Sequence, residues 1–166
     1  FLFYILIMAF IRLNNEFTKI NNNPNYLYII EPNEDNFLIW NFKLIGPPDT
    51  IFDGGIFNGV IKFPKEYPNR PPEVKFVDGF CHPNVYKDGK VCISILHEGE
   101  DQFGYEDSSE RWNPSHSVSS IMISIISMLL DPNLESPANI DAGVLWRDNF
   151  ETYKKNIYKH ISLSQK

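Results

Sequence analysis

The spacing of apolar and polar residues divides the chain into a helical start, a strand-rich middle and a helical end. In the first segment, apolar side chains recur at the spacing of one helix face, and polar residues lie largely between them: Phe10, Leu13, Phe17 and Ile20. This pattern predicts an amphipathic helix over residues 9–21. The helix is expected to end at the three asparagines before Pro24, because proline cannot continue it.

Four runs rich in Ile, Phe, Tyr and Val follow, and clusters of Pro, Gly and Asp separate them: residues 26–30, 37–45, 56–63 and 74–77. β-Branched and aromatic residues favour strands, so each run predicts one strand. The short connections between the runs predict an antiparallel meander. Apolar residues alternate imperfectly in the second run, so this strand is expected to bury both faces.

The remaining segments predict one stiff loop and three helices. Residues 63–72 contain four prolines, which excludes a central strand and predicts an extended loop. Ser117 is a helix-capping residue ahead of an apolar helix that runs to about Leu130. Two apolar stripes on that helix predict that it is buried. Residues 140–148 and 149–163 predict two closing helices.

Length and composition narrow the class of protein. The 166 residues suit one domain, and an apolar fraction of 43% is ordinary for a globular fold. A net charge of −6 argues against a nucleic-acid binder and suits basic partners. Two cysteines form no disulfide framework, so a reducing compartment is expected. The cysteines and four histidines lack metal-ligand spacing, so no metal is expected.

The first eleven residues are all apolar. A bilayer span needs about 20 residues, so this run is too short to cross a membrane. It has neither the positive start nor the small-residue cleavage site of a signal peptide. We expect residues 1–8 to be an upstream apolar extension, with the native start near Met8, and residues 9–166 to form one core domain. A membrane-surface anchor is the alternative.

The stretch HPNVYKDGKVCISIL, residues 82–96, carries the clearest chemistry. Asp88-Gly89 predicts a tight turn, because glycine tolerates positive φ, and this turn would bring Asn84 close to Cys92. A thiol is a strong nucleophile, and an asparagine amide can donate to an oxyanion. The two suggest half of an acyl-transfer site, although no histidine base is evident. The competing interpretation is a small, buried cysteine.

A strongly acidic run occupies residues 97–111. It contains six acids against one arginine: Glu98, Glu100, Asp101, Glu106, Asp107 and Glu110. Runs of charge are usually solvated loops. This run begins five residues after Cys92, so it is expected to lie beside the thiol.

The motifs HPNV, DGKVC and ISIL together resemble the active-site segment of the ubiquitin-conjugating enzymes, and the resemblance covers about residues 9–163. It implies an α+β fold: an N-terminal helix, a four-stranded antiparallel meander, a central helix and two C-terminal helices. In this family the cysteine carries ubiquitin as a thioester, which implies that Cys92 is the acceptor thiol. Asn84 would be the oxyanion donor, with His82 and Pro83 shaping the backbone around it.

The acidic run resembles the insertion of the G and R classes of this family, and the G class is the closer match. Those classes share Ser136, where many relatives carry an aspartate that helps to position or deprotonate the attacking lysine. Three candidates for building the lysine environment therefore remain: Glu135, His97 and the acidic insertion. Tyr105 and Phe103 are expected to gate the thiol.

The resemblance also implies partners. A ubiquitin ligase, expected to be of the RING type, would contact the first helix, Asn69 and Arg70 in the proline loop, and Trp112 and Pro114 in a second loop. The other partners would be ubiquitin, the ubiquitin-activating enzyme and protein substrates, with no nucleic acid and no stable membrane insertion. No bound cofactor is expected, because ATP is consumed on the activating enzyme.

The implied function is transfer of ubiquitin to a substrate or ubiquitin lysine, in the cytoplasm, at the endoplasmic reticulum surface or in the nucleus, for proteasomal degradation. One rival is a catalytically weak scaffold that binds ubiquitin or a ligase, but the presence of both Cys92 and Asn84 favours an enzyme. A thiol protease is the other rival, and it lacks a histidine base. Cys81 and His82 form no dyad, because neighbours on a strand point to opposite faces, and Cys81 is expected to pack.

Overall fold

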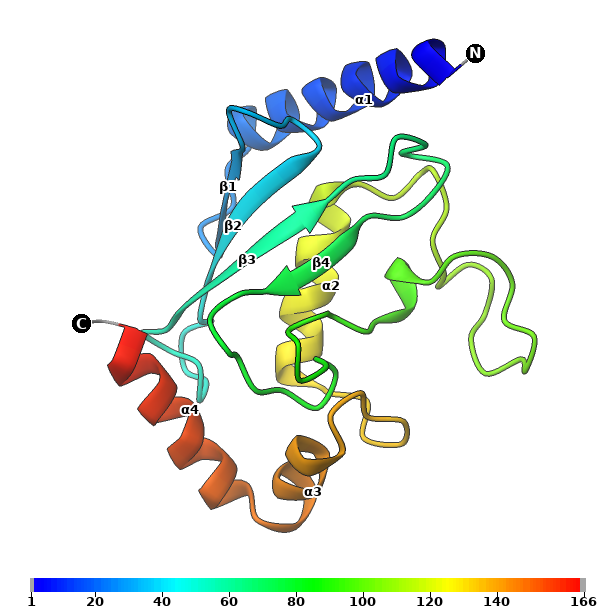
Figure 1. Cartoon of the computed structure of the whole chain (residues 1–166). Helices are drawn as coiled ribbons and strands as arrows, with labels where there is room; N and C mark the ends of the chain where they lie inside the picture. The colour runs from blue at the N-terminus through cyan, green and yellow to red at the C-terminus, as the bar shows by residue number, and fades with distance from the viewer. Residues whose placement is uncertain (1, 165–166) are drawn as a thin grey trace.

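The computed structural model of the chain describes residues 2–164. Its elements follow one another as α1 (Leu2–Asn22), β1 (Tyr28–Pro32), β2 (Ile39–Ile45), β3 (Ile56–Lys62), β4 (Glu73–Phe76), the 3₁₀ turn η1 (Ser94–Leu96), α2 (Val118–Leu130), α3 (Ile140–Asp148) and α4 (Phe150–Ser164). The fold is α+β, as predicted, with α1 across one end of the sheet and α3 and α4 at the other (Figure 1).

The four strands form an antiparallel meander in the order β1-β2-β3-β4. The register pairs Tyr28 with Leu44, and Phe42 with Gly59. The prediction that β2 buries both faces is wrong. Its even-numbered residues are buried, whereas Asn41 and Lys43 are exposed. Only one face is therefore covered, and the polar residues of β2 occupy the other.

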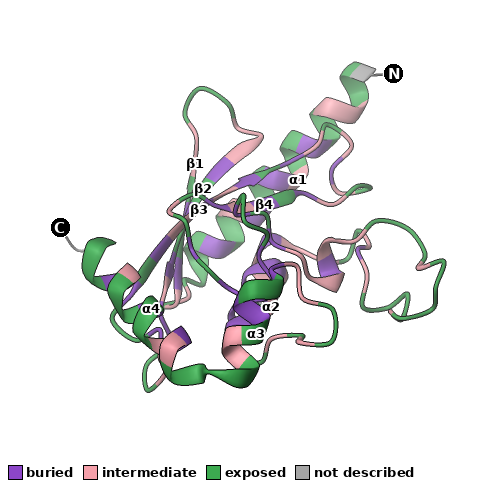
Figure 2. Ribbon diagram, turned by 60° about the horizontal axis from the view of Figure 1, so that its bottom comes forward, coloured by how far each residue is buried: buried purple, intermediate pink, exposed green. Residues whose placement is uncertain are grey.

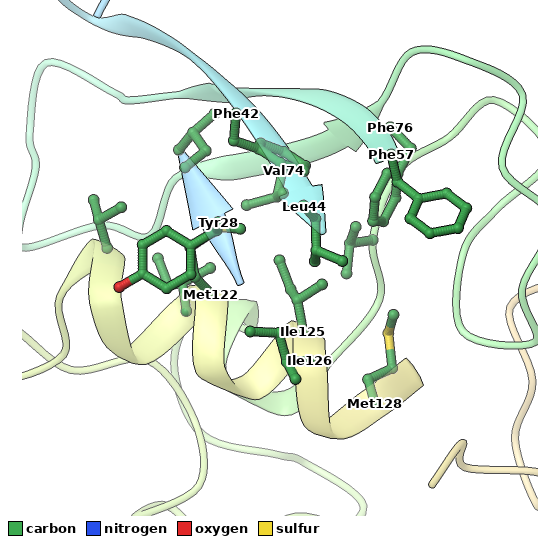
Figure 3. Packing of buried hydrophobic residues seen from close by; sticks show 14 of the residues in the cluster. Tyr28, Phe42, Leu44, Phe57, Val74, Phe76, Met122, Ile125, Ile126 and Met128 are labelled. Atoms are coloured by element: carbon green, nitrogen blue, oxygen red, sulfur yellow. The ribbon is translucent and has the colours of Figure 1, made fainter. Parts of the chain in front are cut away.

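Helix α2 packs against the covered face of the sheet. Figure 3 shows the side chains of the strands and of α2 directed toward one another. Trp40, Leu44 and Ile125 have no exposed surface, and burial of side chains of this size stabilises the fold by about 1.5–3 kcal/mol each. Ser117 caps α2 through a reciprocal capping box with Ser120. The predicted buried central helix and its cap are confirmed.

Helix α1 begins seven residues earlier than the predicted position 9. Its apolar start contains no glycine, proline or polar capping residue that would end a helix, so the helix continues through it. These first turns project beyond the body of the molecule (Figure 2). Phe3 is 77% exposed, whereas Ala9 and Leu13 are buried completely. Contact with the core therefore starts at Ala9.

Candidate active site

A tight turn places Asn84 beside Cys92, as predicted. Gly89 adopts a φ of 93°, and its N–H donates to the carbonyl of Tyr86 at 2.8 Å. The Cys92 N–H donates to the Asn84 carbonyl at 2.9 Å. A Cβ at position 89 would lie 2.1 Å from the carbonyl oxygen of Phe76, so this turn requires glycine for close approach as well as for its φ.

Cys92 is half-buried and lies where two cavities meet. One cavity, of about 430 Å³, opens toward the proline loop and the acidic run, and its lining includes Arg70, Tyr86, His97 and Glu98. The other, of about 290 Å³, opens toward α2 and the loop after it, and its lining includes Asn84, Ser127, Asn133 and Ser136. The thiol is thus accessible from two sides.

The structure corrects the expectation that no histidine stands beside Cys92. The Nε2 atom of His97 lies 3.6 Å from the Cys92 Sγ. The Nδ1 atom of His97 lies 2.9 Å from the carboxylate of Glu106, which also accepts from Arg111 and from the Ser94 hydroxyl at 2.9 Å. A cysteine, a histidine and a glutamate therefore form one hydrogen-bonded chain, in which Arg111 and Ser94 hold the glutamate in place.

This arrangement changes the protonation of the thiol. The hydrogen bond with His97 is the main cause that lowers the pKa of Cys92, against the effect of burial, and Tyr86 lowers it further. The thiolate and Glu106 together raise the pKa of His97 to about 9, although burial opposes this shift. The contact between the two groups therefore shifts the Cys92 thiol toward its thiolate and the His97 ring toward its imidazolium, and the thiolate is the reactive form of a cysteine.

Alkylation of Cys92 should report this pair. In a Cys81→Ser background, the rate of reaction with iodoacetamide is expected to rise with a midpoint below the ordinary thiol pKa of about 8.5. His97→Gln removes the imidazolium that stabilises the thiolate, so the midpoint should move up toward that value. Each unit of this movement should lower the thiolate fraction below the midpoint about tenfold, and the alkylation rate several-fold, because a more basic thiolate is more nucleophilic.

The control for that measurement is His116→Gln, which changes a histidine beside Arg111 but outside both cavities at the thiol. It should leave the midpoint where it is. Equal midpoints for the wild type and His97→Gln would contradict the ion pair.

The side chain of Asn84 is engaged with the loop that follows α2. Its Nδ2 donates to the carbonyl of Asn133 at 2.8 Å, and its Oδ1 accepts from the Asn133 N–H at 2.8 Å. The side chain of Asn133 in turn accepts from the N–H groups of Glu135 and Ser136. Asn84 therefore holds this loop at the second cavity, which Cys92 also lines.

The three candidates for the lysine environment are not equivalent. His97 lines the larger cavity at Cys92, together with Glu98 of the acidic insertion. Ser136 lines the smaller cavity. Glu135 is exposed and lines neither of them. Glu106 and Asn133 also shape the site, although sequence reasoning did not assign them a role. One acid among six, and one asparagine in a loop, carry no spacing signal that would distinguish them.

The acidic run, residues 97–111, is an ordered loop that extends from the body of the molecule (Figure 1). Asp101 folds it by accepting from the N–H groups of Phe103, Tyr105 and Glu106, and these bonds lower the pKa of Asp101. Phe103 and Tyr105 are 80% and 87% exposed and line neither cavity. The two rings therefore do not border the thiol in this structure, and their gating role stays a prediction.

His82 and its neighbours form the support beneath the site. The His82 ring has no exposed surface, and its Nδ1 accepts from the Asn84 N–H at 3.1 Å. Burial lowers the pKa of His82 to about 3, so the ring is neutral. The carbonyl of Pro83 accepts from the Asn139 N–H at 2.9 Å. These contacts fit the expected backbone-shaping role of both residues.

Cys81 differs from expectation, because the residue is exposed rather than packed. Its thiol is partly covered beside the amide of Asn139, 3.9 Å away. That cover, followed by the charge of Asp141, raises the pKa of Cys81. Exposed Cys81 and buried His82 point in different directions, so the two form no dyad.

The implied ligase contacts differ in exposure. Asn69, Arg70 and Pro114 are exposed, whereas Trp112 is buried, with 7% of its surface exposed. The Trp112 Nε1 donates to the carbonyl of Pro68 at 2.8 Å, so this ring holds the proline loop and offers little surface to a partner. Arg70 pairs with Glu98 of the acidic run at 3.0 Å, which joins the loop tip to the mouth of the larger cavity.

Within residues 2–164, no helix is long and apolar enough to cross a membrane. The same residues contain no cluster of three or more His, Cys, Asp or Glu side chains that could hold a metal ion.

A meander sheet covered by one helix, with a half-buried thiol presented beside an HPN motif, defines a class of enzymes that carry an acyl group on cysteine. Residues 12–161 match the family described as ubiquitin-conjugating enzyme. The chain belongs to this family, and it conjugates ubiquitin through a thioester intermediate.

Its relatives place it near the G class. It is 54% identical over 133 residues to ubiquitin-conjugating enzyme E2 7 from Arabidopsis thaliana, and the match covers 80% of each chain. It is 47% identical over 146 residues to ubiquitin-conjugating enzyme E2 G2 from Homo sapiens, covering 87% of this chain and 88% of the relative. The chain is therefore a G-class-like ubiquitin-conjugating enzyme.

Proposed function

We propose that Cys92 is the thiol that carries ubiquitin. The observation that supports this assignment most directly is its position between two cavities, 3.6 Å from His97. The Cys92 thiolate attacks the carbonyl carbon of the thioester on the activating enzyme, and the thiolate of that enzyme leaves. A lysine amine then attacks the Cys92 thioester and loses a proton, and the Cys92 thiolate leaves.

His97 has a role at both steps of this scheme. As an imidazolium, it stabilises the Cys92 thiolate before the thiolate attacks the activating enzyme's thioester. When lysine displaces the thioester, the same cation stabilises the thiolate that leaves. Glu106 keeps the ring oriented, since its carboxylate binds Nδ1 while Nε2 faces the sulfur. The proton lost by lysine goes to solvent.

The partner surface in this proposal consists of α1, the tip of the proline loop at Asn69 and Arg70, and Pro114. A RING-type ligase would bind there, while substrates approach the thiol.

ATP is used by the activating enzyme, so this chain needs no bound cofactor. Scattered free thiols suit the reducing cytoplasm, with the endoplasmic reticulum surface and the nucleus as further sites of action in proteasomal degradation.

We also propose that the exposed acids of the acidic run orient an acceptor ubiquitin. Glu98, Glu100 and Glu110 are exposed, so their charges face an incoming partner. Carboxylates attract the cationic face of an acceptor. They would not deprotonate its lysine, because nearby negative charge favours the ammonium. Orientation, rather than proton transfer, is therefore the role that fits these residues.

The combined substitution Glu98→Gln, Glu100→Gln and Glu110→Gln tests this role and leaves Glu106 in place. Charging by the activating enzyme should stay nearly unchanged. Single-turnover discharge to ubiquitin should slow several-fold at low salt, and the difference should shrink at about 1 M salt, where the Debye length falls to about 3 Å. Discharge to free lysine should be unaffected.

The matched control changes the same number of acids on the β1–β2 hairpin, where Glu31, Glu34 and Asp35 are also exposed. Their amide variants alter the net charge equally and should leave discharge to ubiquitin intact. Equal slowing for both acceptors at every salt concentration would show that Glu98, Glu100 and Glu110 themselves belong to the catalytic centre.

A further inference from the structure

Helix α1, the proline loop and the start of α2 meet at one buried carboxylate. Glu16 of α1 is only 5% exposed. Its Oε1 accepts from Arg12 Nε and from the Tyr67 hydroxyl, both at 2.6 Å. Its Oε2 accepts from the N–H of Val118 at 2.7 Å. One donor from α1 itself and two donors from segments distant in sequence therefore bind the two oxygens of one side chain.

Arg12 extends this cluster to the loop before α2. Its Nη1 donates to the carbonyl of Pro114 at 3.0 Å, and its Nη2 donates to the carbonyl of His116 at 2.7 Å. The negative charge of Glu16 is balanced by this guanidinium and by the positive end of the α2 dipole. A buried carboxylate is tolerated here because each of its oxygens is hydrogen-bonded.

The two loops are also held to each other. The Trp112 indole donates to Pro68, next to Tyr67, and the rings of Tyr67 and Trp112 lie 5.8 Å apart. Tyr67 is 1% exposed, so its hydroxyl has no water to replace Glu16. The loops at Asn69 and at Pro114 thus share one buried anchor, although both of these residues are exposed.

We propose that Glu16 is a positioning residue that holds α1, the proline loop and the 112–117 loop as one preformed partner-binding surface. This inference rests on the proposed function, in which these segments contact the partners of the enzyme. Preforming a surface removes the cost of ordering it during binding. Loss of the carboxylate would leave the Tyr67 hydroxyl and the Val118 N–H without an adequate acceptor, so the three segments would loosen together.

Glu16→Gln is the test variant, because it keeps the shape of the side chain and removes its charge. The first readout is amide hydrogen exchange, which needs no partner. Reporters are the N–H groups of Asn69 and His116, which bond within their own loops at 2.8 and 3.0 Å. Both are expected to exchange about tenfold faster, a change that corresponds to about 1.4 kcal/mol, while amides of α4 change little.

Two further variants separate positioning from general stability. Ile157→Val removes one methylene from a fully buried side chain of α4, so it lowers stability without touching the cluster. In this variant, the difference in exchange rate between the two loop reporters and the amides of α4 should stay as it is in the wild type. Tyr67→Phe removes one donor to Glu16 and should accelerate exchange at Asn69 more than at His116.

The second readout uses the ubiquitin-activating enzyme as the probe. Glu16→Gln should raise the apparent KM for this chain in the charging reaction about tenfold, with kcat within about twofold, because loosening affects binding rather than chemistry. Exchange that changes only at the start of α2, or a KM equal to that of Ile157→Val, would overturn the positioning role. A wild-type chain that does not charge would contradict the proposed function instead, which the exchange readout does not require.

Discussion

Cys92→Ala is expected to abolish formation of the reducible ubiquitin adduct when the chain is incubated with activating enzyme, ATP and ubiquitin. The physical reason is that no other group at the site can form a thioester. Cys92→Ser should lose charging, since a hydroxyl has a far higher pKa than a thiol and is a weaker nucleophile. If the serine is charged at all, the adduct should be an oxyester, which survives reducing agent. Non-reducing and reducing gels read the two outcomes directly.

Cys81→Ser is the matched control, because it changes the second thiol of the chain. Cys81 is exposed, but no histidine lowers its pKa, which is instead raised. This variant should charge at the wild-type rate. A reducible adduct on Cys92→Ala would move the acceptor thiol to Cys81 and would overturn the assignment.

Asn84→Ala should produce the second largest effect, a loss of about 10²–10³ in the rate of discharge to lysine. An oxyanion donor acts only in the transition state, so charging should persist while kcat for discharge falls. The oxyanion role requires the second N–H of the Asn84 amide to reach the thioester oxygen, because the first already donates to Asn133. Single-turnover discharge of the isolated thioester measures this rate.

The bonds to Asn133 offer a competing explanation, in which Asn84 serves only to hold the loop after α2. Asn84→Asp separates the two, because it keeps an acceptor for the Asn133 N–H and removes the donor. Discharge as slow as that of Asn84→Ala supports the oxyanion role. A rate near the wild type for Asn84→Asp would make the residue structural.

The sequence alone predicted the elements whose cause is local. The period of the apolar residues located α2, and Ser117 marked its start, since capping depends on neighbouring backbone groups. The Asp88-Gly89 dipeptide predicted the turn that brings Asn84 beside Cys92, because a φ of 93° is one that glycine adopts readily. The family motifs added the acceptor thiol. These features need no knowledge of what lies across the fold.

Local patterns were less informative where burial depends on distant elements. The imperfect alternation of apolar residues in β2 suggested two buried faces, but only one helix layer covers the sheet, so Asn41 and Lys43 face outward. Trp112 was expected to be a contact residue, yet the proline loop lies over it. In both cases the covering element is remote in sequence, and no periodicity records it.

The chemistry of the thiol was decided by tertiary structure. His97 is close to Cys92 in sequence, but its ring faces the sulfur because Glu106 and Arg111 hold it there from within the folded acidic run. Asn133 reaches Asn84 from 49 residues away. A histidine becomes an imidazolium partner only when distance, orientation and a neighbouring charge coincide. The sequence alone named Cys92 as the proposed nucleophile, whereas the fold determined the groups that shift its pKa.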